Sequence, residues 1–263
     1  MTKPKKPAPR ILTVKDAFYL TPHMIRVVFQ GPELASVYAG CAGANCKIFV
    51  PEIGQTRADF EACFVDGPAP VKRTYTVRSF DPDTLEMVID FVAHGDEGPA
   101  SAWAMRAETG SFLGFAGPSE VKIKEFYADW YLVAADMSAL PVAGAALEAM
   151  PRDAKGVAIF EVQSAEDAQD LDVPAGIDVH WLVQANPHKP STAQEEFMRN
   201  MVWPEGVVQT CVAGESGVIK AIRGYFTKER ELPRDDVYIS GYWKIGLIED
   251  EHQLVKRQEA AAV

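Results

Sequence analysis

The chain has few cysteines for its length, four in 263 residues, and no two of them form a Cys-x-x-Cys pair. Cys41 and Cys46 have the first spacing of a plant-type iron–sulfur ligand set, but the next ligand position, 49, holds phenylalanine. This pattern disfavours a metal cluster. We expect all four to be free thiols in a reducing compartment: Cys41, Cys46, Cys63 and Cys211.

Long apolar runs are also missing. No stretch of the sequence is long enough to span a bilayer. The basic residues 1–7 lack the apolar core of a signal peptide. The sequence therefore predicts a cytoplasmic protein with no membrane partner.

The chain has fewer basic than acidic residues. It contains 26 Lys and Arg residues and 37 Asp and Glu residues, which gives a formal net charge of −11. Nucleic acids and anionic membranes are disfavoured as partners, since both carry negative charge. An anionic substrate would need a local group of basic side chains to overcome the overall field.

Three motifs of common enzyme classes are absent. The sequence has no His-Glu-x-x-His and no Gly-x-Ser-x-Gly, which disfavours zinc and serine hydrolases. It also has no Gly-x-Gly-x-x-Gly, so the standard dinucleotide fingerprint is not available.

The first half of the chain contains closely spaced, alternating strand patterns separated by turn residues. Such spacing predicts a small antiparallel barrel. A helical pattern that begins near Ser101 interrupts it. The six predicted strands cover residues 11–18, 24–30, 46–50, 73–80, 84–93 and 110–118.

The pattern changes near residue 125. Short apolar strand patterns then alternate with helical ones, which predicts parallel βαβ units. We therefore predict a β-barrel domain over residues 1–124 and an α/β domain with a C-terminal helical tail over residues 125–263. In the second domain the predicted strands cover residues 131–135, 157–162, 179–183, 208–213 and 237–240, and the predicted helices 140–150, 192–200 and 219–229.

One strand pattern, Arg73-Thr74-Tyr75-Thr76-Val77-Arg78, carries an aromatic ring, hydroxyls and two arginines. A tyrosine ring can stack on a flavin, and arginine forks can bind its phosphates or its electron-rich edge. Strand alternation would place Arg73, Tyr75 and Val77 on one face and Thr74, Thr76 and Arg78 on the other.

A second segment, Gly98-Pro99-Ala100-Ser101, precedes a helical pattern. Proline near a helix start and serine beside it are typical of a helix N-terminus. Free backbone N–H groups at such an end attract phosphate. The two segments together predict a place for a flavin and its pyrophosphate.

Arg-x-Tyr-Thr followed by Gly-x-x-Ser resembles the flavin signature of the ferredoxin–NADP reductase superfamily. Arg78 and the stretch from residue 94 to 104 narrow the resemblance to the siderophore-interacting proteins, which are flavin-dependent ferric-siderophore reductases. Two later stretches also resemble the family pattern and come in the family's order. They are residues 135–141, and residues 213–216 followed by 241–246. The resemblance runs over nearly the whole chain.

The resemblance implies a six-stranded flavin-binding barrel followed by a parallel-sheet nicotinamide-nucleotide-binding domain. It implies hydride transfer from NADH or NADPH to FAD, then single-electron reduction of siderophore-bound Fe(III) to release Fe(II). The flavin carries this chemistry, so no catalytic side chain is implied. The implied flavin contacts are Arg73, Thr74, Tyr75, Thr76, Val77, Arg78, Asp90, Val92, His94, Gly98, Pro99, Ala100 and Ser101.

The family usually has Gly-Asp in the loop after the first strand of the second domain, whereas this chain has Ala135-Asp136. Alanine narrows the backbone freedom there. Capping of the next helix by Asp136 or Ser138 explains these residues equally well. The implied dinucleotide contacts are Asp136, Ser138, Ala139, Leu140, Glu161, Glu215, Tyr242 and Trp243.

Glu161 ends the second strand of this domain, where a carboxylate can accept a hydrogen bond from a ribose 2′-hydroxyl. Residues 162–167 contain no Arg or Lys to neutralise a 2′-phosphate. The sequence therefore favours NADH over NADPH.

Tyr242, Trp243 and Lys244 follow the predicted last strand, where the resemblance places them over the flavin or the nicotinamide. The family usually has arginines after the tryptophan, and here Lys244 and Ile245 stand instead. Ordinary solvated lysines are an equally good reading of the basic residues. We expect a group of lysines to attract an anionic ferric chelate: Lys47 and Lys244, with Lys122 or Lys124 as a weaker third.

Two alternatives remain open at this stage. One is a superfamily reductase that exchanges electrons with a ferredoxin or an oxygenase, and the other is a non-catalytic siderophore-binding protein. A further hypothesis is that the tail from residue 249 onwards controls substrate access.

Overall fold

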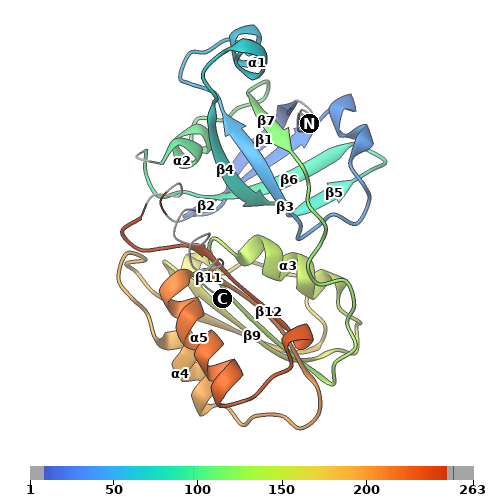
Figure 1. Cartoon of the computed structure of the whole chain (residues 1–263), viewed down its shortest axis with the longest axis vertical. Coiled ribbons are helices and arrows are strands. Elements are labelled where there is room, and N and C mark those ends of the chain that lie inside the picture. Colours follow the sequence, from blue (N-terminus) through green and yellow to red (C-terminus); the bar gives the residue numbers. More distant parts are fainter. Residues whose placement is uncertain (1–8, 97, 248–250, 252–263) are drawn as a thin grey trace, which may run out of the picture. The chain divides into compact units, whose positions relative to one another are not determined.

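The computed structural model describes residues 9–96, 98–247 and 251. Clustering of contacts divides the chain into two compact units, unit 1 over Met1–Val121 and unit 2 over Lys122–Val263. Figure 1 shows the strands and helices of both units.

Unit 1 is built on a seven-stranded sheet in the order β4-β3-β7-β1-β2-β6-β5, in which every pair of neighbours is antiparallel. In β2 and β3 buried and more exposed residues alternate, as a sheet with one covered face requires. Their bounds are β1 Arg10–Thr21, β2 Met24–Gln30, β3 Asn45–Val50, β4 Val71–Thr76, β5 Ser79–Asp81, β6 Glu86–Val92 and β7 Phe112–Ala116.

The sheet of unit 1 is curled, because β4 and β5 lie at its opposite edges yet are joined only by Val77 and Arg78. The Val77 N–H donates to Ala44 O beside β3 (2.9 Å), and the Arg78 N–H donates to Val88 O on β6 (2.8 Å). The predicted antiparallel barrel is confirmed as a curled half-barrel. The predicted count of six strands is wrong, since residues 73–80 form two strands that pair with different partners.

The interior of the curled sheet holds fully buried side chains from almost every strand, including Phe29, Ile48, Phe91 and Phe115. Helix α2 (Pro99–Ala104) inserts Trp103 against Phe29 and Phe91, with ring centroids 6.2 and 5.6 Å apart. The remaining elements of unit 1 are the 3-10 helix η1 (Pro32–Ser36) and helix α1 (Arg57–Asp66).

Unit 2 is built on a five-stranded parallel sheet in the order β10-β9-β8-β11-β12. The α/β architecture predicted from sequence is confirmed. Its strands are β8 Trp130–Asp136, β9 Lys155–Val162, β10 Gly176–Val183, β11 Val208–Glu215 and β12 Val237–Trp243, and its helices are α3 Leu140–Ala149, α4 Ala193–Asn200 and α5 Ser216–Lys228, with 3-10 helices η2 Ala165–Asp167 and η3 Arg234–Asp236.

Helices α4 and α5 bury Met198, Ile222 and Phe226 against β8, β9 and β11. Helix α3 is buried along most of its length and lies against β8 and β11. After β8 the chain passes to β9 and β10 on one side, and it then returns to β11 and β12 on the other. The carboxyl ends of β8 and β11 therefore flank a topological switch point, where open α/β sheets bind ligands.

Two local predictions in unit 2 are wrong. Asp136 is the last residue of strand β8 and does not lie in a loop after it. Gly214 and Glu215 end β11, and α5 starts directly at Ser216. Tyr242 and Trp243 are the last residues of β12 and do not follow it.

None of the helices in the described part of the chain is both long and apolar enough to cross a membrane.

Candidate functional site

Tyr75 lies near the end of β4, and its half-buried ring packs on Phe91 with centroids 4.5 Å apart. Its neighbour Thr74 pairs with Lys47 across the β3–β4 ladder, and the Lys47 ammonium donates a hydrogen bond to the Thr74 hydroxyl. Unit 1 therefore presents the Tyr75 ring near the end of a strand, while strand alternation places the Lys47–Thr74 pair on the other face of the sheet.

The two arginines of the segment differ in environment. Arg73 is half-buried and its Nη1 donates to the adjacent Lys72 O at 2.9 Å. Arg78 is buried at 8 % exposure, beside the buried Thr76 and Val77. Strand β4 ends at Thr76 and the chain crosses to β6 at Val77 and Arg78, so the predicted alternation does not extend to these two residues.

Asp90 forms an ion pair with Arg26 within unit 1. Its two carboxylate oxygens accept from Nε and Nη2 of Arg26, each at 2.8 Å, on directly opposed positions of β2 and β6. The Asp90 side chain is 1 % exposed and that of Arg26 is 23 % exposed. A direct flavin contact of Asp90 stays a prediction, as does that of the half-buried Val92 at the end of β6.

The Gly98–Ser101 segment forms the start of α2, with Gly98 as N-cap and Pro99 as first helical residue. The Ser101 hydroxyl accepts from the His94 N–H (3.1 Å) and donates to Gly95 O (2.8 Å), which fixes the turn between β6 and α2. A Cβ on Gly98 would lie 2.5 Å from the His94 ring. Glycine at this position lets the His94 ring pack against the backbone.

These features fit FAD. Helix geometry leaves the first N–H groups of α2 without an acceptor inside the helix, and a phosphate can use them. Because α2 has only six residues, its dipole adds little, so the N–H groups of its first turn carry the fit. Tyr75 offers the stacking surface on a separate strand of the same unit.

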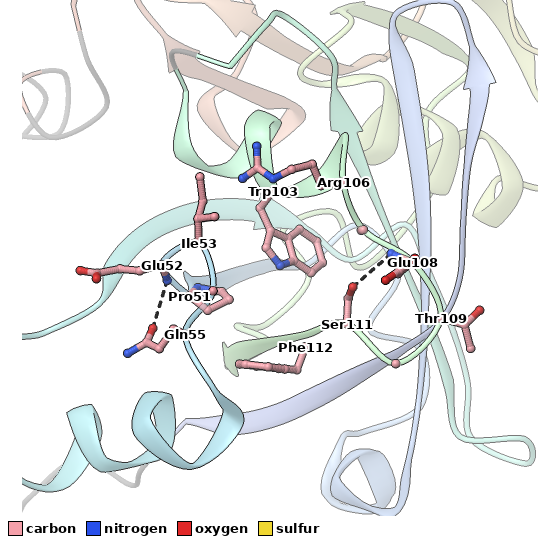
Figure 2. Close-up of a pocket in the computed structure, with 13 residues that line it drawn as sticks. Pro51, Glu52, Ile53, Gln55, Trp103, Arg106, Glu108, Thr109, Ser111 and Phe112 are labelled. Atoms are coloured by element: carbon pink, nitrogen blue, oxygen red, sulfur yellow. Dashed lines mark hydrogen bonds between the residues drawn. The ribbon is translucent and has the colours of Figure 1, made fainter.

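A hollow of about 460 Å³ opens at the other end of α2, and Figure 2 shows its lining. The indole of Trp103 and the side chain of Arg106 face the loop from Pro51 to Gln55, where Gln55 Oε1 accepts from the Glu52 N–H at 3.0 Å. No residue selected from the sequence lines this hollow, because loops far apart in the chain form it.

Asp136 stands at the carboxyl end of β8, partly buried. Its Oδ1 accepts from the Ser138 N–H (2.9 Å) and the Ser138 hydroxyl (2.5 Å), and its Oδ2 accepts from Trp243 Nε1 (2.7 Å). Burial raises the pKa of this carboxyl, and the bonds from Ser138 and Trp243 oppose that rise. The side chains of Ala139 and Leu140 are buried, so only their backbone can face a ligand.

Glu215 ends β11 and caps α5, since its Oε2 accepts from the N–H groups of Gly217 (2.5 Å) and Val218 (3.0 Å). Its Oε1 accepts from the Ile245 N–H at 3.2 Å. Capping of α3 by Asp136 or Ser138, the alternative explanation of these residues, is wrong, because α3 has Ala139 as N-cap and no side-chain cap.

Glu161 lies near the carboxyl end of β9, and its Oε2 accepts from the Ser191 hydroxyl at 2.6 Å. Burial raises the pKa of Glu161, and the nearby Asp136 adds to this rise while the Ser191 bond opposes it. Sequence reasoning missed Ser191, which follows β10 and comes thirty positions later in the chain. Hydrogen bonds thus bring together Asp136 with Trp243, and Glu161 with Ser191.

The predicted basic residues are distributed over both units. Lys47 belongs to unit 1, and Lys122, Lys124 and Lys244 belong to unit 2. Lys122 and Lys124 are exposed, whereas Lys244 is half-buried just after β12.

The buried cysteines are poor candidates for chemistry. Burial raises the pKa of Cys41 to about 11 and those of Cys46 and Cys211 to about 12, so they are protonated at neutral pH. All four cysteines are free thiols. The tail hypothesis falls on residues that, apart from Glu251, lie outside the described part of the chain.

Comparison with known proteins assigns both halves of the sequence. Residues 13–122 match the siderophore-interacting FAD-binding domain, and residues 128–246 match the siderophore-interacting protein model. The chain is 32 % identical over 253 residues to the ferric vibriobactin reductase ViuB of Vibrio cholerae, covering 93 % of this chain and 92 % of that protein.

Solved structures agree with this assignment. The siderophore-interacting protein SipS from Aeromonas hydrophila superposes with a TM-score of 0.83 at 33 % identity, covering 97 % of this chain and 98 % of that one. The ferredoxin-NADP+ reductase from Plasmodium falciparum shares the fold alone, with a TM-score of 0.61 at 10 % identity over 89 % of this chain and 96 % of that one. With both halves matched and a relative above 30 % identity along its length, the chain belongs to the siderophore-interacting protein family.

Proposed function

We propose that this protein is a cytoplasmic ferric-siderophore reductase that uses FAD and NADH. The observation that carries the proposal is the match of both halves, in order, to the siderophore-interacting models. The relatives named ferric vibriobactin reductase and ferric acinetobactin reductase support it. In the balanced reaction NADH becomes NAD+ with release of one proton, and two ferric siderophores each gain one electron.

Bound FAD would supply the step from two-electron to one-electron transfer. The protein's part is to hold it. Tyr75 would stack on the ring system, Arg73 would bind phosphate oxygens, and the Gly98–Ser101 segment would bind the pyrophosphate through backbone N–H groups. Hard oxygen chelators bind Fe(III) more tightly than Fe(II), so reduction itself weakens the hold of the chelator on the iron. Release of the iron therefore needs no side-chain acid or base.

The nicotinamide nucleotide would bind at the carboxyl edge of the sheet in unit 2. Glu161 would meet the adenosine ribose there. Ser191 binds its Oε2, and among the described residues no donor reaches its Oε1. An open carboxylate oxygen accepts from a 2′-hydroxyl and repels a 2′-phosphate, which favours NADH.

Glu161→Gln is expected to lower the KM for NADPH roughly tenfold while changing the KM for NADH less. The variant removes the charge that repels the phosphate and keeps an acceptor for the hydroxyl. The matched control is Glu205→Gln, an exposed carboxylate just before β11 at the opposite edge of the sheet. A wild-type KM for NADPH well below that for NADH would overturn the assignment.

Lys47 and Lys244 would draw an anionic ferric chelate to a protein of net charge −11. Lys47→Ala and Lys244→Ala are each expected to weaken binding of such a chelate about fivefold at low salt, and less at high salt. Lys228→Ala, an exposed lysine at the end of α5, is the control. Unchanged affinities in both variants would remove the two lysines from the substrate site.

A further inference from the structure

The three residues after Tyr242, Trp243-Lys244-Ile245, are attached on both sides of the lysine to carboxylates from other strands. We call them the edge segment. The Trp243 indole Nε1 donates to Asp136 at 2.7 Å, and the Ile245 N–H donates to Glu215 at 3.2 Å. Asp136 ends β8 and Glu215 ends β11, so both anchors come from the strands that flank the switch point.

A β-bulge directs the indole to its acceptor. In the β11–β12 ladder Gly214 pairs with Gly241 and Glu215 pairs with Trp243, so Tyr242 is one residue in excess. Such an insertion re-aims the side chain that follows it. Gly214 makes room for the acceptor, because a Cβ there would lie 2.7 Å from Asp136 Oδ2.

The hydrogen bonds of the two carboxylates are accounted for within unit 2. Each oxygen of Asp136 and each oxygen of Glu215 accepts at least one donor from the chain itself. The donors are backbone N–H groups, one hydroxyl and one indole N–H. Carboxylates whose oxygens already accept these hydrogen bonds hold the chain in place and can accept few further bonds from a ligand.

We infer that Asp136 and Glu215 are positioning residues for the ferric-siderophore step: they fix the edge segment and thereby the backbone of Lys244. This role rests on the proposed function, in which Lys244 attracts an anionic ferric chelate. It differs from the expectation that both carboxylates contact the dinucleotide. The two roles make different predictions for binding.

Asp136→Asn supplies one acceptor oxygen where the carboxylate supplies two, so it cannot serve both Ser138 and Trp243 as before. Trp243→Phe removes the indole donor and keeps a ring. Each variant is expected to weaken binding of an anionic ferric tricatecholate about fivefold. The double variant should bind the chelate no more weakly than either single one, because Trp243→Phe already removes the indole bond through which Asp136 holds the edge segment.

Glu215→Gln provides an independent variant. Its amide oxygen can still cap α5, whereas its amide nitrogen cannot accept from the Ile245 N–H. Ferric tricatecholate binding should weaken in the same direction as for Asp136→Asn, while the fold of α5 is kept.

Two further readouts make the test decisive. Of the five indole N–H resonances, only that of Trp243 should shift in Asp136→Asn, whereas general unfolding would shift all five. In a Lys244→Ala background, Asp136→Asn should have no further effect on ferric tricatecholate binding.

The outcomes separate this inference from the proposed function. If Lys244→Ala alone leaves chelate affinity unchanged, the lysine role in the proposed function fails. If Lys244→Ala weakens binding but Asp136→Asn does not, and instead raises the KM for NADH, Asp136 contacts the dinucleotide and the positioning role is overturned.

Discussion

Tyr75→Leu is expected to bind FAD about tenfold more weakly than the wild type, because leucine keeps apolar volume against Phe91 but removes the stacking ring. Combining it with Arg73→Ala also removes a charge-assisted bond to phosphate and should bring the loss to roughly a hundredfold. The measurement is quenching of FAD fluorescence on titration with flavin-free protein.

Two variants control this experiment. Tyr75→Phe keeps the ring and should retain most of the affinity. Tyr19→Leu alters a tyrosine of β1 that is 54 % exposed and should bind FAD as the wild type does. FAD affinity that is unchanged in Tyr75→Leu would show that the flavin does not stack on this ring.

Asp90→Ala is expected to destabilise the protein by about 3 kcal/mol, because it leaves the half-buried Arg26 without its bidentate partner. Denaturant unfolding of the flavin-free protein measures this loss. Asp16→Ala, an exposed aspartate on β1, should change stability far less.

The double variant Arg26→Leu/Asp90→Leu identifies the role of the pair. Replacing both charges with apolar side chains should recover most of the lost stability. If stability returns and FAD binding returns with it, Asp90 acts through the fold. If stability returns and FAD binding does not, Asp90 contacts the flavin. An Asp90→Ala variant as stable as the wild type would contradict the ion pair.

Strand and helix patterns in the sequence predicted most elements of both units to within a few residues. The strand count failed at Val77 and Arg78, because these residues continue the alternating pattern while their N–H groups bond to Ala44 and Val88 in different parts of the sheet. Periodicity carries no information about which partner a strand takes.

Helix α1 was missed for a different reason. Among its ten residues only Phe60 is buried, so no apolar stripe marks it. It is held instead by Thr56, whose hydroxyl accepts from the Asp59 N–H (3.2 Å), and by packing of Phe60 and Phe64 on each other with centroids 5.1 Å apart. Only the N-cap is visible in the sequence.

Sequence patterns were limited in the same way for the residues of the candidate site. The segment from Arg73 to Arg78 could be selected from the sequence because its residues are consecutive. The bond between Asp136 and Trp243 spans 107 positions and the pair of Arg26 with Asp90 spans 64. Such partners are set by strand order, and a single sequence does not reveal strand order.

Anaerobic stopped-flow spectroscopy of the FAD-loaded protein tests the central claim most directly. NADH is mixed in first and a ferric hydroxamate siderophore second, while flavin absorbance is followed. The account predicts bleaching by NADH and recovery of absorbance with the ferric siderophore. Bleaching without recovery would assign another electron acceptor, such as a ferredoxin, and failure of NADH to bleach the bound flavin would contradict the reductase assignment.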